Sequence, residues 1–95
     1  MTGKQRAYLR SLCNTLPAII FVGKEGVTAT LVNSVNEALE ARELIKLGVQ
    51  RGSSLTAREA CETLCEQTNS EPVQCIGNKF CLYRARKENP AIVLP

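Results

Sequence analysis

The spacing of apolar residues along the chain predicts three helices and four strands. Apolar residues recur every three or four positions in three segments, which is the spacing of one face of a helix. Two of these segments begin with a capping box, in which a Thr is followed three residues later by Gln or Glu. The predicted helices begin after Thr2, Thr28 and Thr56. The predicted strands are 18–22, 44–51, 73–76 and 79–85.

The predicted strands differ in how we expect them to be covered. Residues 18–22 form a continuous apolar run rich in β-branched side chains, which is typical of a strand covered on both faces. Residues 44–51 place apolar side chains at alternate positions, so one face of this strand is expected to be apolar. Gly77 and Asn78 separate the last two strands, and such a pair is typical of a two-residue hairpin.

The order of the predicted elements, α-β-α-β-α-β-β, indicates an α/β domain of the α+β type. A strand-helix-strand connection is right-handed and makes the first two strands parallel, whereas a hairpin makes the last two antiparallel. We therefore expect one compact domain over residues 1–86, with a mixed four-stranded sheet packed by helices, and a C-terminal tail at 87–95. The pattern leaves open whether the helices cover one face of the sheet or parts of both.

Composition limits the chemistry that the chain can perform. Its 95 residues are 44% hydrophobic, which suits one small domain, and its net charge of +3 is too small to identify a nucleic-acid binder by itself. The sequence has no Asp and no His, which removes histidine general bases, Ser-His-Asp arrangements and Cys/His zinc sites. We therefore expect no catalytic residue, no metal site and no cofactor.

Five cysteines and the lack of a targeting segment favour a reducing compartment. The N-terminal residues contain no apolar stretch of signal-peptide length, and no segment is long and apolar enough to span a membrane. We expect a monomeric cytoplasmic protein with free thiols and no membrane partner. Cys61 and Cys65 share one face of the third predicted helix, but that face is the apolar one, so core packing is favoured over metal binding.

The segment Gly23-Lys24-Glu25-Gly26 lies between the first strand and the second helix. One interpretation is a tight turn that needs a positive φ at one or both glycines. The segment lacks the spacing of a dinucleotide-binding loop and the ending of a P-loop. The other interpretation is a phosphate site, because the segment opens on the helix that begins after Thr28. The N–H groups of a helix N-terminus attract an anion, and Lys24 adds a charge.

Arg84 and Arg86 form a second candidate site, at the end of the last predicted strand. Alternation places both side chains on the same side of that strand. They are either a solvated strand edge that is protected by charge, or a basic strip that follows a phosphate backbone.

Four segments in order resemble the YhbY/CRM family, the RNA-binding domains of chloroplast RNA splicing and ribosome maturation. They read TGKQRAYLR, FVGKEGVT, NEALEARELIK and VQCIGNKFCLYR, and together they cover nearly the whole chain. The resemblance implies a fold close to the C-terminal domain of translation initiation factor three. It also implies RNA contact through a loop like that of KH domains, which clamps backbone nucleotides. Gly23, Lys24 and Gly26 fall in that loop.

The resemblance favours the stand-alone bacterial branch of the family, whose members look like ribosome-associated proteins linked to large-subunit assembly. We therefore expect a non-catalytic protein that binds ribosomal RNA or the precursor of the large ribosomal subunit. Two alternatives remain, a protein-interaction module of a ribonucleoprotein and a small phosphate-ligand-binding protein or enzyme. The expected RNA-binding residues are Gly23, Lys24, Gly26, Thr28, Arg84 and Arg86.

Overall fold

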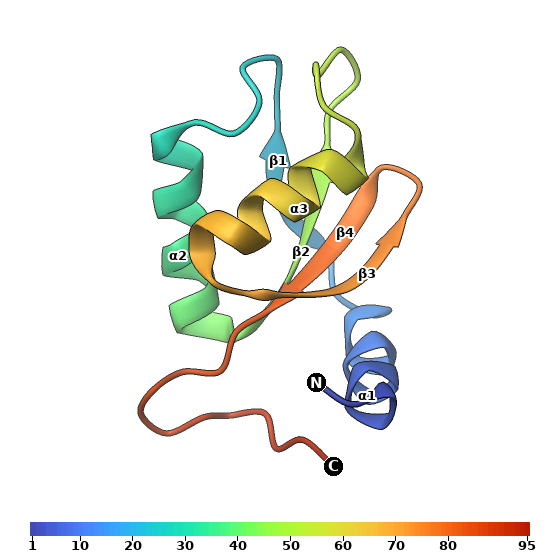
Figure 1. Ribbon diagram of the computed structural model, residues 1–95, viewed down its shortest axis with the longest axis vertical. Helices are drawn as coiled ribbons and strands as arrows, with labels where there is room; N and C mark the ends of the chain where they lie inside the picture. The colour runs from blue at the N-terminus through green and yellow to red at the C-terminus, as the bar shows by residue number, and fades with distance from the viewer.

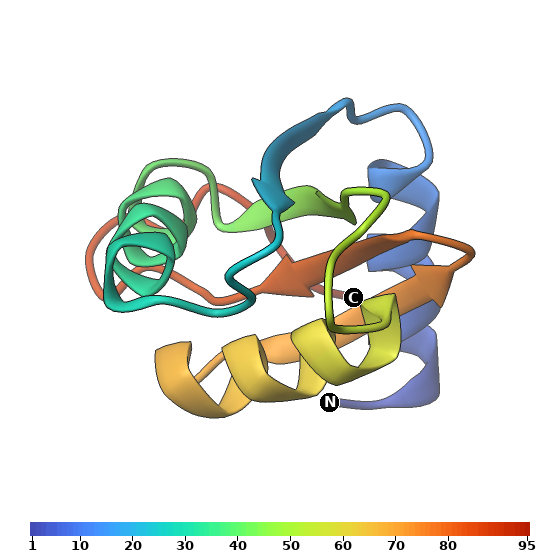
Figure 2. The same cartoon turned by 90° about the horizontal axis from the view of Figure 1, so that it is seen from above.

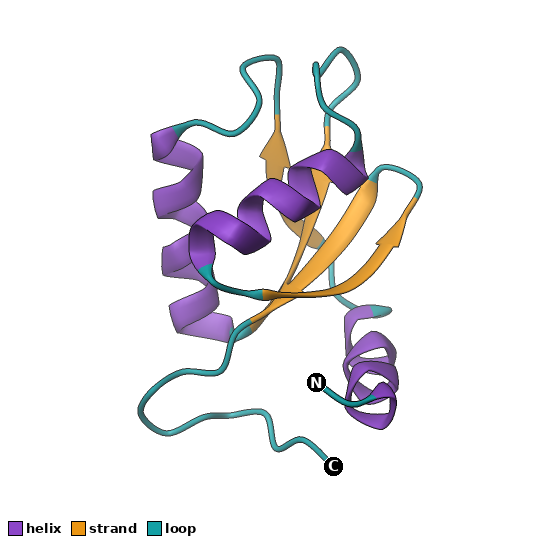
Figure 3. Cartoon of the chain, viewed as in Figure 1, coloured by secondary structure: helices purple, strands orange, loops and turns teal.

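Three helices and four strands follow each other in the predicted order in the computed structural model, which describes residues 1–95 (Figures 1 and 3). The helices are α1 (Gly3–Cys13), α2 (Ala29–Arg42) and α3 (Ala57–Thr68). The strands are β1 (Ala18–Val22), β2 (Leu44–Val49), β3 (Glu71–Ile76) and β4 (Lys79–Tyr83). The predicted α+β domain is confirmed. No helix combines the length and the apolar character needed to cross a membrane.

Each helix begins at the threonine that the sequence indicated. The Thr2 hydroxyl accepts a hydrogen bond from the Gln5 N–H at 3.1 Å, and the Gln5 side chain accepts one from the Thr2 N–H at 3.1 Å. Thr56 and Glu59 exchange the same pair of bonds at the start of α3. These reciprocal bonds satisfy N–H groups that have no partner inside the helix, so both predicted capping boxes are confirmed.

The four strands form one mixed sheet in the order β1-β2-β4-β3. β1 pairs with β2 in parallel, and β4 is antiparallel to both β2 and β3, as predicted. Three strand boundaries differ from the prediction. β3 begins at Glu71, β2 ends at Val49 and β4 ends at Tyr83. β4 stops at Tyr83 because Tyr83 pairs with Leu44, the first residue of β2. The next N–H group, that of Arg84, donates to the carbonyl oxygen of Glu43, which lies outside β2.

The helices cover parts of both faces of the sheet. α2 and α3 pack on one face, and α1 packs on the other (Figure 2). The larger core cluster, under α2 and α3, consists of Val22, Val35, Leu39, Ile45, Leu47, Val49, Ala57, Ala60, Cys61, Leu64, Phe80 and Leu82. The smaller cluster, under α1, consists of Leu9, Cys13, Leu44, Val73, Cys81 and Tyr83.

The prediction that both faces of β1 are covered is wrong. Ile20 and Val22 pack into the larger core, but the side chains of Ile19 and Phe21 are 37% and 47% exposed. β1 lies at the edge of the sheet, and α1 packs on β2 and β3 instead of on β1. The apolar run forms the strand that the sequence predicts, but its composition does not indicate which of its faces a helix covers.

A buried carboxylate joins the end of α2 to the C-terminal residues. The side chain of Glu43 is fully buried, and its backbone has a φ of 65° in the left-handed region that L residues rarely adopt. Its carboxylate accepts hydrogen bonds from the N–H groups of Arg86, Ala91 and Ile92 at 2.9, 2.7 and 2.9 Å. Ile92 then packs against the smaller core cluster. The residues expected to be a tail contain no helix or strand, and Glu43 attaches them to the domain.

Burial alone would raise the pKa of the Glu43 carboxyl group. The three N–H bonds and the positive charge of Arg86 outweigh burial, so the pKa is lowered. A carboxylate with a lowered native pKa stabilises the fold at pH values above its ordinary pKa of about 4.3. That stabilisation is lost as the pH falls through the lowered native pKa.

We predict that Glu43→Gln lowers the free energy of unfolding by about 2 kcal/mol at pH 7, because a neutral amide accepts the three N–H bonds less well than a charged carboxylate. The difference from the native protein should shrink as the pH is lowered and the native carboxylate is protonated. Urea unfolding at a series of pH values measures both effects. Glu88→Gln, which removes an exposed carboxylate from the same C-terminal segment, is the control. Equal urea midpoints for Glu43→Gln and Glu88→Gln at pH 7 would contradict the prediction.

Candidate nucleic-acid interface

The loop between β1 and α2 is a closed turn. The Gly26 N–H donates to the Gly23 carbonyl oxygen at 3.1 Å, and Gly26 has a φ of 71°. The positive φ expected at one or both glycines is therefore confirmed at Gly26. A Cβ on Gly26 would lie 3.4 Å from Leu55, and one on Gly23 would lie 3.1 Å from the Gln50 side chain. Gly26 is therefore required by its positive φ, whereas a Cβ at Gly23 would only displace the end of the Gln50 side chain.

The loop leads directly into the N-terminus of α2. Thr28 caps this helix, since its hydroxyl accepts a hydrogen bond from the Leu31 N–H at 3.1 Å. The first backbone hydrogen bond of the helix runs from the Val32 N–H to the Thr28 carbonyl oxygen. The N–H groups of Ala29 and Thr30 come before this donor, so they are available to an external acceptor. The helix dipole adds a partial positive charge at the same end. An anion placed here would meet N–H donors and a favourable field.

A hollow of about 320 Å³ lies against the loop, and the two charged loop residues are exposed beside it. The structure has one ion pair, between Arg84 and Glu40, so Lys24 and Glu25 do not neutralise each other or any other side chain. The Lys24 ammonium group is therefore free to contact a ligand. The hollow is lined by Phe21, Gly23, Lys24, Glu25, Gly26, Thr28 and Leu31.

Arg84 and Arg86 lie at the opposite end of the sheet from this loop. β4 runs antiparallel to β2, so Lys79 lies opposite Gly48 near the loop, whereas Tyr83 lies opposite Leu44 at the far end. Both arginines follow Tyr83, so Arg84 lies outside the strand in which it was predicted, and Arg86 follows the strand as expected. The six predicted site residues therefore separate into a loop group of four and a distant pair.

The two arginines make contacts within the protein. The Arg84 guanidinium donates hydrogen bonds to the Asn36 side chain at 2.8 Å and to the Thr68 carbonyl oxygen at 2.7 Å, and it pairs with Glu40 at 3.6 Å. Arg84 thus ties α2 to the end of α3. Arg86 is half-buried and its N–H donates to the Glu43 carboxylate. These contacts give both residues a structural role at this end of the molecule.

Sequence reasoning missed three side chains on the face of the sheet that borders the loop. Phe21 lines the hollow and is 47% exposed, and the ammonium nitrogen of Lys79 lies 5.5 Å from the centre of its ring. Lys46 projects from the same face of the sheet as Lys79, since it is two residues from Gly48, the partner of Lys79. No local pattern could have grouped these residues, because they come from three strands that are distant in the sequence.

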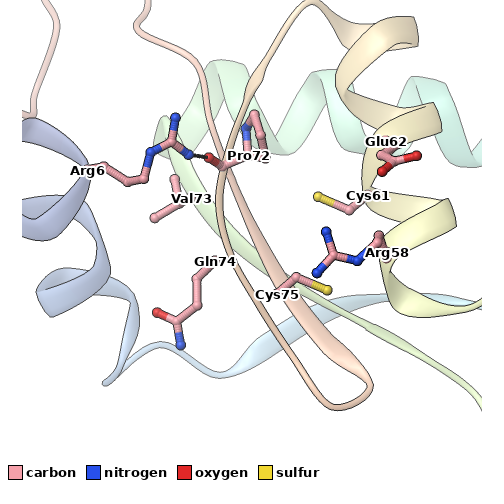
Figure 4. Close-up of a pocket in the computed structure, with 8 residues that line it drawn as sticks. All are labelled: Arg6, Arg58, Cys61, Glu62, Pro72, Val73, Gln74 and Cys75. Atoms are coloured by element: carbon pink, nitrogen blue, oxygen red, sulfur yellow. Dashed lines mark hydrogen bonds between the residues drawn. The ribbon is translucent and has the colours of Figure 1, made fainter. Parts of the chain in front are cut away.

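A second hollow, of about 300 Å³, lies at the free edge of β3 (Figure 4). The Arg6 guanidinium donates a hydrogen bond to the Pro72 carbonyl oxygen there. Figure 4 shows the side chain of Arg58 reaching toward β3 between Cys61 and Cys75, and Glu62 on α3 also lines the hollow. Arg6 is thus already engaged with the strand, and Glu62 opposes the binding of an anion.

The five cysteine thiols form neither disulfides nor a metal-binding group. All five cysteines are free, and no group of three or more His, Cys, Asp or Glu side chains is placed to hold a metal ion. A hydrogen bond to Cys65 and burial raise the pKa of the Cys61 thiol, and burial with a hydrogen bond to Cys13 raises the pKa of Cys81 to about 12. Both thiols are therefore protonated near neutral pH. The predicted core packing is confirmed for Cys61, and Cys65 packs half-buried against the same core.

We predict two classes of thiol reactivity in the folded protein. Cys65 and Cys75 are half-buried, and the pKa of Cys65 is lowered by its hydrogen bond to Cys61, so these two thiols should react first with iodoacetamide at neutral pH. Cys13, Cys61 and Cys81 are buried and should react only when the chain unfolds. Peptide mass spectrometry after timed labelling, with a urea-unfolded control, measures each site. Labelling of Cys81 in the folded protein at the rate of Cys65 would contradict this assignment.

A family model and two known proteins each match most of this chain. The model of the CRS1/YhbY (CRM) domain family matches residues 1–84. A protein of Bacillus subtilis named "Probable RNA-binding protein YqeI" is 43% identical over 95 residues, which are 100% of this chain and 99% of that protein. A protein of Haemophilus influenzae named "RNA-binding protein" is 28% identical and is covered over 89% of its length, with 93% of this chain aligned.

A solved structure shares the fold as well as the sequence. The solution structure of a protein from Staphylococcus aureus superposes with a TM-score of 0.83 and is 43% identical to this chain. The match covers 100% of this chain and 99% of that protein. The arrangement of three helices on a mixed four-stranded sheet is therefore common to this chain and that relative.

Proposed function

The chain belongs to the CRS1/YhbY (CRM) domain family, and from this premise we propose that it binds RNA through the loop at residues 23–28. The observation that carries the proposal is the hollow beside the loop, where the start of α2 and the unpaired Lys24 meet. Two relatives whose names describe RNA binding align with most of this chain, and they support RNA as the ligand. The protein acts in this proposal as a binding module without catalysis.

The loop binds the RNA backbone by offering several donors to one phosphate. The N–H groups of Ala29 and Thr30 supply hydrogen bonds, and the helix dipole favours the negative charge. Lys24 adds a charge-assisted bond from the outside of the turn. Gly26 makes this geometry possible, because its positive φ lets the chain turn sharply between β1 and α2. Glu25 opposes the phosphate and limits affinity.

The proposed target is ribosomal RNA in the precursor of the large ribosomal subunit, bound by a monomer in the cytoplasm. The support for this target is the resemblance of the chain to stand-alone bacterial members of the family. The similarity to the Bacillus subtilis relative extends over the full chain, which is consistent with that branch. Crosslinking in cells, followed by sequencing of the bound RNA, tests the target. Recovery of messenger or transfer RNA without ribosomal RNA would refute it.

We predict that the affinity for single-stranded RNA depends strongly on salt. If about four phosphates are contacted, log K plotted against the logarithm of salt concentration should have a slope of roughly −3, because each contact releases condensed counterions. Fluorescence anisotropy with a labelled RNA at several salt concentrations gives the slope. A slope near zero would rule out binding through phosphates and would favour a protein-interaction module.

We predict that the two charged residues of the loop act in opposite directions. Lys24→Ala should weaken RNA binding and Glu25→Asn should strengthen it, each by about 0.3–1 kcal/mol at low salt, because both charges are exposed. Both effects should shrink as salt rises, since exposed charges are screened. Lys87→Ala removes an exposed cation at the opposite end of the molecule and is the matched control. If Lys24→Ala and Lys87→Ala weaken binding equally, the loop is not the binding site.

A further inference from the structure

One row of residues crosses all four strands on the face that α1 only partly covers. Phe21 on β1 is the register partner of Gly48 on β2, Gly48 is the partner of Lys79 on β4, and Lys79 is the partner of Ile76 on β3. Register partners on neighbouring strands project from the same face, so the four positions form one continuous strip. With strands about 4.8 Å apart, the strip is about 14 Å wide.

No helix covers this strip. α1 packs on the same face nearer to Leu44 and Tyr83, at the other end of the strands. There its side chains Leu9 and Cys13 join the smaller core cluster. Beyond them, Phe21 and Ile76 are exposed and Lys79 is half-buried. Phe21 is 47% exposed and Ile76 is 65% exposed, and both are among the most exposed large apolar residues of the chain.

The ring of Phe21 lies close against the sheet. A Cβ added at Gly48 would be 3.0 Å from the Cε1 atom of Phe21 and 3.2 Å from the Cδ atom of Lys79. Any larger residue at this position would therefore push the ring and the lysine away from the strand. The Lys79 ammonium nitrogen lies 5.5 Å from the ring centre, which is within the range of a cation–π contact. Glycine at position 48 thus lets an aromatic ring and a cation come together on an open surface.

The charge on this face favours a polyanion. Lys46 and Lys79 project from it, and Lys24 lies beside it in the loop. Two hollows border this face, and Glu25 in the loop is the one carboxylate among the residues that line them. Glu71 lies farther along this face as the register partner of Tyr83, but the strip and the next row of register partners contain no Asp or Glu: Phe21, Gly48, Lys79, Ile76, Ala18, Lys46, Cys81 and Gln74. An aromatic ring among lysines is the surface on which single-stranded nucleic acids stack their bases.

We propose that Phe21 is a stacking platform for an unpaired RNA base, and that the protein therefore prefers single-stranded RNA to a duplex. The proposal rests on the proposed function and specifies the form of RNA that the same site accepts. Phe21 belongs to the strip and also lines the hollow of the loop, so the two contacts are adjacent. A backbone held by the loop places a neighbouring base over Phe21, and Lys79 and Lys46 attract the next phosphates. Bases in a duplex are already stacked and cannot use the ring.

Phe21→Trp provides a direct signal, because the native chain has no Trp. The single indole should lose fluorescence when a single-stranded RNA of about ten nucleotides and mixed sequence stacks on it. A duplex of the same sequence should leave the emission unchanged. Val93→Trp, at a position that is 79% exposed in the C-terminal segment, is the control and should not respond to either RNA.

Phe21→Ala separates stacking from phosphate binding. Single-stranded RNA should bind about tenfold to a hundredfold more weakly, while the salt slope stays that of the native protein, because a stacked base adds affinity without releasing counterions. Phe21→Leu keeps an apolar residue in the strand and should show the same loss, and circular dichroism verifies that both variants fold. Salt-dependent RNA binding that neither Phe21→Ala nor Phe21→Leu weakens, with no quenching of Phe21→Trp, would overturn the stacking site alone. No RNA binding by the native protein would overturn the proposed function as well.

Discussion

The parallel pairing of β1 with β2 is the constraint on which the rest of the structure depends. Two parallel strands need a connection that returns along the sheet, and α2 provides it on one face. The chain therefore leaves β1 at one end of the sheet and enters β2 at the other. The loop at residues 23–28 lies at the first end, together with the start of β4. The buried Glu43 lies at the second end, where it holds the C-terminal segment.

This separation divides the charged residues by role. At the Glu43 end, the carboxylate binds three backbone N–H groups, and Arg84 joins α2 to α3 through hydrogen bonds and an ion pair with Glu40. These charged groups are therefore already bonded to other parts of the protein. At the loop end, Lys24 and Lys79 have no carboxylate partner. The modest net charge of +3 therefore understates how favourable the loop end is to an anion, because position decides what a charge can bind.

The short length of α1 determines which part of the sheet stays exposed. A four-stranded sheet has two faces to cover, and α2 and α3 together cover one of them. α1 is a helix of 11 residues and covers only the end of the other face that contains Leu44 and Tyr83. The apolar side chain of Phe21 is left exposed as a result. Exposing the apolar ring to water is unfavourable. Stacking of an RNA base on Phe21, as proposed, would cover that ring.

Local signals in the sequence determined the elements and their order. Thr2, Thr28 and Thr56 begin the helices because a hydroxyl bonds an N–H three residues ahead, and the two-residue turn at Gly77 and Asn78 makes the hairpin. The resemblance to the family then pointed to the loop. Tertiary structure alone decided that one face of β1 stays open, that Arg84 is held by α2 and α3, and that Phe21, Gly48 and Lys79 share one row. These facts depend on strand order and helix placement, which join residues far apart in the sequence, and no local pattern encodes such contacts.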